Sequence, residues 1–137
     1  MVEINNQTSE TIDEAAFCRV AESILKQEGR QDSSFSLAFV GEEESRRLNR
    51  EYRKKDEPAN VLSFPESAFG LGEVILCPAQ IRREANEYGI IYSMHLLRVF
   101  IHGILHLLGY DHEKGALEAK LMEKKEESYI TSLSPSF

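Results

Sequence analysis

The chain has 137 residues, of which 42% are hydrophobic and 28% are charged, the composition of an ordinary globular protein. This composition excludes a disordered or low-complexity chain, and the length predicts one domain over residues 1–137. The formal net charge of -7 excludes a wholly basic surface of the kind that grips nucleic acid indiscriminately, although it is compatible with a local basic patch.

The cysteine usage and the N-terminal pattern indicate a compartment. Cys18 and Cys77 are far apart in sequence and fit no CxxC motif, so we expect reduced packing residues of a cytosolic protein. The first residues have neither the basic nor the apolar segment of a secretory signal. The most apolar stretch, Leu96–Tyr110, contains an arginine and two histidines and is shorter than the roughly 20 residues that span a membrane. We therefore expect a cytoplasmic protein with no membrane partner.

The hydrophobic pattern predicts short strands early in the chain and helices late. Strand-like patterns cover residues 2–4, 35–40, 61–64 and 73–77. Helical spacing covers residues 12–27, 42–53, 78–88, 93–108 and 114–129. We expect Pro65 to end the third strand and Gly70 and Gly72 to lie in a loop. Ser93 is the expected cap of the fourth helix, and residues 132–135 the expected frayed tail. The mixture favours an α+β fold.

Three of the four histidines occur in one window, His102–His112. His102 and His106 are four residues apart on a predicted helix, so both imidazoles lie on one helix face with Cβ atoms about 5–6 Å apart. Gly109 can end this helix and turn the chain so that His112 supplies a third imidazole. Three neutral imidazoles suit Zn²⁺, with Ni²⁺ or Cu²⁺ as less suitable ions. The pattern predicts one zinc ion held by His102, His106 and His112.

The alternative for these histidines is a role in packing or on the surface. The surrounding helix is apolar on nearly every side, so two unsatisfied imidazoles there carry a desolvation cost, which favours the metal site. His95 is expected on nearly the same face, as a pocket residue or as a packed histidine. The spacing H-x3-H-x2-G-x2-H is that of the metzincin peptidases, but Gly103 replaces their general-base glutamate. Asp111 is a candidate substitute base, although an aspartate beside a turn commonly bonds backbone.

The histidine window also resembles the signature of the YbeY family, bacterial rRNA maturation factors described as single-strand-specific endoribonucleases. Further blocks of the family are similar to Leu48–Arg53 followed by Asp56, to Val61–Pro65, and to Gly72–Ile75. The likeness covers most of the chain from residue 35 to residue 113. This chain departs from the family by Ala59-Asn60 where Thr-Asp is frequent, which removes a carboxylate and a hydroxyl near the expected cleft, and by Glu73 where Asp is frequent.

This resemblance implies a zincin-like mixed sheet of about four strands flanked by helices, with zinc on the three histidines. It implies an important arginine, which maps onto Arg53. It further implies a metal-dependent endoribonuclease that acts in maturation of the 16S rRNA 3′ end and in ribosome quality control. The implied partners are single-stranded RNA and the small ribosomal subunit or its associated proteins.

Basic charge is concentrated in one segment of an acidic chain. Between residues 46 and 55 only Glu51 is acidic, whereas six residues are basic: Arg46, Arg47, Arg50, Arg53, Lys54 and Lys55. Arg46, Arg50 and Arg53 share a predicted helix face on which a phosphate backbone can lie, since guanidinium groups pair with phosphate oxygens. The alternative is a solvated face paired with acidic neighbours. Extension of the patch by Arg82, Arg83 and Arg98 stays open.

Tyr52 and Tyr110 are candidates to stack on unpaired bases, with packing as the alternative.

Two rival functions remain. A metallopeptidase or amidase has the histidine spacing but lacks the base. A non-catalytic ribosome-assembly factor with structural zinc would need a fourth protein ligand, for which the candidates are His95, Asp111 and Cys77.

Overall fold

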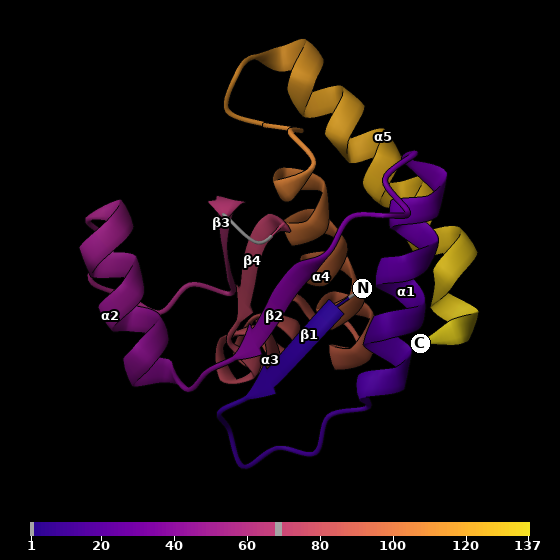
Figure 1. Cartoon of the computed structure of the whole chain (residues 1–137). Coiled ribbons are helices and arrows are strands. Elements are labelled where there is room, and N and C mark those ends of the chain that lie inside the picture. The colour runs from indigo at the N-terminus through magenta and orange to yellow at the C-terminus, as the bar shows by residue number, and fades with distance from the viewer. Residues whose placement is uncertain (1, 68–69) are drawn as a thin grey trace.

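The computed structural model describes residues 2–67 and 70–137 and arranges them as one sheet with helices on both faces (Figure 1). The elements, in chain order, are β1 (Val2–Asn6), α1 (Glu14–Gln27), β2 (Phe35–Phe39), α2 (Glu42–Arg53), β3 (Val61–Ser67), β4 (Gly70–Leu76), α3 (Pro78–Tyr88), α4 (Tyr92–Leu107), α5 (Ala116–Leu133) and a short 3₁₀ helix (Ser134–Ser136). Within these described ranges no helix is long and apolar enough to cross a membrane.

The four strands form a mixed sheet in the order β1-β2-β4-β3. β1, β2 and β4 run parallel, and β3 pairs antiparallel with β4 and occupies an edge of the sheet. The predicted α+β class, with a mixed sheet of about four strands flanked by helices, is confirmed.

The alternating side chains of the sheet divide the core between its two faces. Leu37 and Phe39 of β2 face the main core, which they share with buried side chains of α1, α4 and α5. Ala38, between them in sequence, faces a smaller cluster on the opposite side, where Leu48 of α2 packs. In Figure 1, α2 accordingly stands on one side of the sheet, and α1, α4 and α5 stand on the other. Because α4 lies between the sheet and α5, most of its side chains are buried, as the apolar sequence predicted.

Two predictions about β3 and β4 are wrong. Pro65 does not end the third strand, which continues to Ser67, because β3 is an edge strand and tolerates a residue without a backbone N–H. Gly70 and Gly72 lie inside β4 rather than in a loop. Gly72 has φ +130°, and a Cβ there would lie 2.1 Å from the carbonyl oxygen of Phe64. The absence of a side chain at Gly72 therefore allows β3 and β4 to approach each other closely.

The ends of the last two helices also differ from prediction. The N-cap of α4 is Ile91 rather than Ser93, because the chain re-enters a helix directly after the left-handed turn at Gly89. α5 continues to Leu133, and a 3₁₀ helix follows where a frayed tail was expected. Phe137 explains why these last residues are ordered, because its ring packs edge-on against Phe17 with the ring centroids 5.0 Å apart.

Candidate active site

Gly103 lets the histidine-bearing helix α4 lie directly on the sheet. The hydroxyl of Ser63 in β3 donates a hydrogen bond to the Gly103 carbonyl at 3.1 Å. A Cβ at Gly103 would lie 2.9 Å from Cγ1 of Val74 and 3.1 Å from Cγ2 of Val61. Val74 is fully buried and its branched side chain is stiff, so it cannot easily move aside for a side chain at position 103. The position that carries the base in metzincin peptidases is thus sterically closed in this chain.

One cavity of about 660 Å³ collects most of the residues singled out from the sequence. Its walls come from the end of α2, from β3, from α4, from the loop after α4 and from α5. The lining residues include all four histidines, two arginines and two glutamates: His95, His102, His106, His112, Arg53, Arg98, Glu113 and Glu126. This volume is typical of a small-molecule site, so the cavity has room for a nucleotide.

His102 is oriented by a carboxylate that the sequence analysis missed. Nδ1 of His102 forms a short contact with Oε1 of Glu126 from α5, whose side chain is only 14% exposed. If this ring nitrogen donates its proton to the carboxylate, Nε2 is left unprotonated. Such an arrangement is common for histidines that bind metals, because the carboxylate fixes both tautomer and ring orientation.

His106 lies one turn further along α4 and is partly buried. Its Nδ1 is buried and has no hydrogen-bond partner among the described residues. Burial lowers the pKa of His106, and the nearby imidazoles of His102 and His112 lower it further, whereas Asp111 and Glu113 raise it; the net pKa is below the ordinary value. The ring is therefore neutral at neutral pH, which is the form that binds metal ions.

His112 joins the other two from the loop after α4. Gly109 takes a positive φ of +102° and ends the helix, as predicted. The rings of His102 and His112 then lie 5.1 Å apart between centroids. Nevertheless, within the part of the chain that the structure describes, no three His, Cys, Asp or Glu side chains are gathered closely enough to hold a metal ion. The fold brings the three imidazoles to one cavity without arranging them as a finished metal site.

The three candidates for a fourth protein ligand lie in different environments. His95 lines the cavity, but its Nε2 contacts Oε1 of Glu84 at 2.8 Å. It precedes His102 by two helical turns, roughly 10 Å along the axis. Asp111 accepts a hydrogen bond from the Glu113 amide at 2.9 Å, the turn role considered for it. Cys77 is buried and caps the start of α3, away from the described cavity lining.

At the departure Ala59-Asn60, the asparagine pairs with a carboxylate from another helix. Asn60 lines the cavity and donates a hydrogen bond from its amide to Oε1 of Glu84 at 2.9 Å. Glu84 thereby joins Asn60 to His95. A carboxylate therefore lies beside position 60, although the frequent aspartate of the family is absent there.

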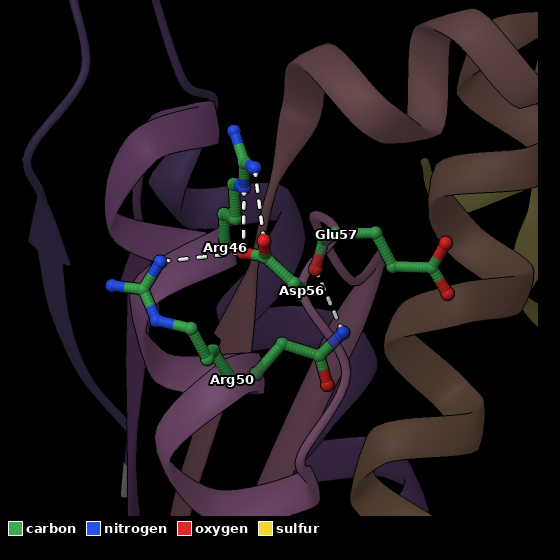
Figure 2. A network of polar contacts seen from close by, with 5 residues as sticks. Arg46, Arg50, Asp56 and Glu57 are labelled. Atoms are coloured by element: carbon green, nitrogen blue, oxygen red, sulfur yellow. Dashed lines mark hydrogen bonds and ion pairs between the residues drawn. The ribbon is translucent and has the colours of Figure 1, made fainter.

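The basic face of α2 is largely occupied by acidic partners. Arg46 and Arg50 approach Asp56 from two sides, with nitrogen to oxygen distances of 2.8 and 3.2 Å (Figure 2). Arg47 pairs with Glu44 and Glu51. For these three arginines the structure supports the alternative of a solvated, ion-paired face.

Arg53 differs from its neighbours because it lies in the cavity wall and no acidic partner is described for it. Of the three arginines considered as extensions, only Arg98 lines the cavity, and it pairs with Glu127 at 2.8 Å. Arg82 and Arg83 are instead paired with Glu10 and Glu42. The arginine best placed for an anionic ligand is thus Arg53.

A partly buried carboxylate, Glu28, ties the histidine-bearing loop to α1 and α5. Its side chain is 10% exposed and accepts hydrogen bonds from Tyr110 at 2.7 Å, from Lys125 at 3.0 Å and from Tyr129. Burial raises the pKa of Glu28, but the three hydrogen bonds and the charge of Lys125 outweigh it, so the pKa lies below its ordinary value. Tyr110 is therefore a packing residue, and it holds the chain two residues before His112.

Replacing Glu28 with glutamine is expected to lower the free energy of unfolding at neutral pH by about 2 kcal/mol, because hydrogen bonds to charged acceptors are worth about 1.5–3 kcal/mol. The depressed pKa makes this contribution complete above the ordinary value of 4.5 and progressively lost as pH falls through the folded-state pKa. Urea denaturation at neutral and at acidic pH should show the stability difference between wild type and Glu28→Gln narrowing in acid. An equal difference at both pH values would contradict the assigned role.

Comparison with known proteins identifies the family. The family model described as "Endoribonuclease YbeY" matches residues 3–134. Proteins of that name from Geobacter metallireducens and Alteromonas mediterranea are 41% and 44% identical, over 94% and 82% of this chain and 92% and 75% of their own. A solution structure from Thermotoga maritima is similar with a TM-score of 0.69 and 30% identity, over 97% of this chain and 89% of that one. With its sheet, its histidine cavity and these matches, the chain belongs to the YbeY family of endoribonucleases.

Proposed function

We propose that the chain is a zinc-dependent endoribonuclease that cuts single-stranded RNA in the cavity beside α4. His102, His106 and His112 would hold one zinc ion, and Arg53 would contact the scissile phosphate. One observation carries the proposal, namely that three imidazoles and an arginine without a described acidic partner line the same cavity.

The donor set fits zinc. The pKa of His106 is lowered, which favours its neutral form, and its buried Nδ1 has no described hydrogen-bond partner. His102 is oriented through Nδ1 by Glu126, which leaves Nε2 available. Three histidines with an open fourth position are the ligand set of catalytic rather than structural zinc.

The residues of the chain divide the work of phosphodiester cleavage. When bound, zinc supplies Lewis acidity and lowers the pKa of water near the phosphate. Arg53 would pair with the phosphoryl oxygens and stabilise the negative charge that grows on them in the transition state. Glu126 would keep His102 in one tautomer throughout the reaction. The nature of the cleaved ends distinguishes attack by water from attack by the ribose 2′-OH, because only attack by the 2′-OH yields a 2′,3′-cyclic phosphate.

Two rival functions are less consistent with the geometry. A peptidase needs a base where Gly103 leaves no space for a side chain. A structural zinc site needs a fourth protein ligand, but His95 is two helical turns away and contacts Glu84. Asp111 accepts a hydrogen bond from the Glu113 amide, and Cys77 lies away from the described cavity lining. Both arguments favour a catalytic site with a phosphodiester substrate.

The cellular setting follows from the family resemblance and belongs to the same proposal. The RNA would be ribosomal RNA, cut during maturation of the 16S 3′ end and in ribosome quality control. The small ribosomal subunit or its associated proteins would be the partners. Residues 1–137 would form a single metal-dependent hydrolase domain that acts in the cytoplasm.

A direct test compares substrates with and without chelator. Zinc-loaded protein is incubated with single-stranded RNA, with the same RNA annealed to its complement, and with an unstructured peptide. Cleavage of the single strand alone, abolished by chelation and restored by zinc, is the expected result. Chelator-sensitive hydrolysis of the peptide would instead support the peptidase, and no hydrolysis of either substrate would support the assembly factor.

Arg53→Ala is expected to reduce kcat roughly 10²–10³-fold, the usual loss when one donor to a developing anion is removed. Zinc content should stay at the wild-type value, because Arg53 is not a metal ligand in this scheme. Arg47→Ala is the matched control, since it removes the same charge from the same helix but outside the described cavity lining. Equal losses in both variants, or a parallel loss of zinc in Arg53→Ala, would contradict this role.

A further inference from the structure

One aromatic side chain of the cavity wall is exposed and lies outside the hydrophobic core. Tyr52, in the last turn of α2, is 59% exposed and lines the cavity beside Arg53. Phe64 of β3 braces it from one side, with ring centroids 5.1 Å apart and an interplanar angle of 68°. Because more than half of the residue stays exposed, Tyr52 presents ring surface that a ligand in the cavity can cover.

The neighbouring groups indicate the chemistry of that ligand. Arg53 adds a guanidinium without a described acidic partner to the same wall, whereas Arg46, Arg47 and Arg50 are paired with carboxylates. An aromatic ring beside an available guanidinium matches a nucleotide, which has a flat base next to a phosphate. A stacked base must be free of its own strand, since bases inside a duplex keep both faces covered.

We propose that Tyr52 is the platform on which an unpaired base next to the scissile phosphate stacks, and that this contact contributes to selectivity for single strands. The inference rests on the proposed endoribonuclease function and adds a specificity-determining residue to it. Arg53 then binds the phosphate, and Tyr52 binds the base.

The test combines Tyr52→Leu with RNA that lacks one base. Cleavage of a short single strand is measured for the intact RNA and for versions with an abasic site at each position around the cut. Tyr52→Leu is expected to lose roughly 5- to 150-fold in kcat/KM on intact RNA, the range for one base stacked on an aromatic ring. At one position the abasic RNA should cost wild type a similar factor and cost Tyr52→Leu nothing further. Tyr52→Phe should stay near wild type, as should the control Tyr88→Leu at an exposed tyrosine outside the described cavity lining.

A second readout follows binding before cleavage. With 2-aminopurine at the sensitive position, stopped-flow fluorescence should be quenched on binding to wild type and to Tyr52→Phe, but much less on binding to Tyr52→Leu. Arg53→Ala should flatten the slope of log affinity against log salt by roughly 0.7, the value for one phosphate contact with a single strand, and Tyr52→Leu should not. If Tyr52→Leu and wild type lose equally at every abasic position while wild type still cuts RNA, the stacking proposal fails alone. If wild type cuts no RNA, the proposed function fails with it.

Discussion

Replacing His106 with alanine is expected to reduce cleavage of single-stranded RNA by about 10³-fold or more. A bound metal contributes several kcal/mol of transition-state stabilisation, and each 1.4 kcal/mol is about tenfold in rate. His106 lines the cavity together with His102 and His112, and burial lowers the pKa of its imidazole, so its replacement removes one of the three proposed zinc ligands. Single-turnover cleavage and zinc content measured on the same preparation check both losses together.

The fold of His106→Ala should be retained, because the substitution removes a side chain whose buried Nδ1 makes no described hydrogen bond. A circular dichroism spectrum like that of wild type is the control, and identical purification of both proteins accounts for contaminating ribonucleases. Cleavage at the wild-type rate by a zinc-free His106→Ala protein would contradict metal-dependent catalysis.

Gly103→Glu, which restores the peptidase pattern, is expected to destabilise the protein by roughly 3 kcal/mol or more. Overpacking by a few atoms already costs about 1–3 kcal/mol, and glutamate adds a carboxylate that burial strongly disfavours. The new Cβ would lie 2.9 Å from Cγ1 of the fully buried Val74, so α4 must move away from the sheet. Movement of α4 would also displace His102 and His106, and no gain of peptidase activity is expected.

Urea denaturation of wild type, Gly103→Ala and Gly103→Glu measures this effect. The free energy of unfolding should fall in that order, because alanine tests the Cβ contact alone and glutamate adds bulk and charge. A Gly103→Glu protein as stable as wild type would show that α4 can retreat from β3 and β4 without cost. Packing at Gly103 would then not exclude a peptidase base at this position.

The main features of α4 could be predicted from local spacing. The four-residue interval between His102 and His106 places both rings on one face of any α-helix, whatever surrounds it. Gly109 likewise ends the helix through a conformation that glycine adopts readily. Such features depend on short stretches of backbone, so they can be predicted without the tertiary structure.

The partners of these histidines could not be predicted, because they come from distant segments. Glu126 lies 24 residues after His102, in a helix that carries several other glutamates, and no pattern in that helix distinguishes it from them. Glu84 reaches His95 and Asn60 from α3 in the same manner. A contact between helices depends on how they pack, which the periodicity of either helix leaves undefined.

The basic segment illustrates the same limit. Helical spacing correctly places Arg46 and Arg50 on one face, where both reach the same carboxylate. That carboxylate, Asp56, lies after the end of the helix, and the chain must turn back before it can pair with them (Figure 2). Charge counting alone therefore overestimated the basic surface available to a phosphate backbone.

The zinc K-edge X-ray absorption spectrum of the zinc-loaded protein tests the central claim most directly, because it reports the atoms bound to the metal whether or not a substrate is known. The account predicts one zinc per chain with three imidazole nitrogens and one water oxygen. A fourth protein ligand such as a thiolate sulfur, or no stoichiometric zinc at all, would contradict it.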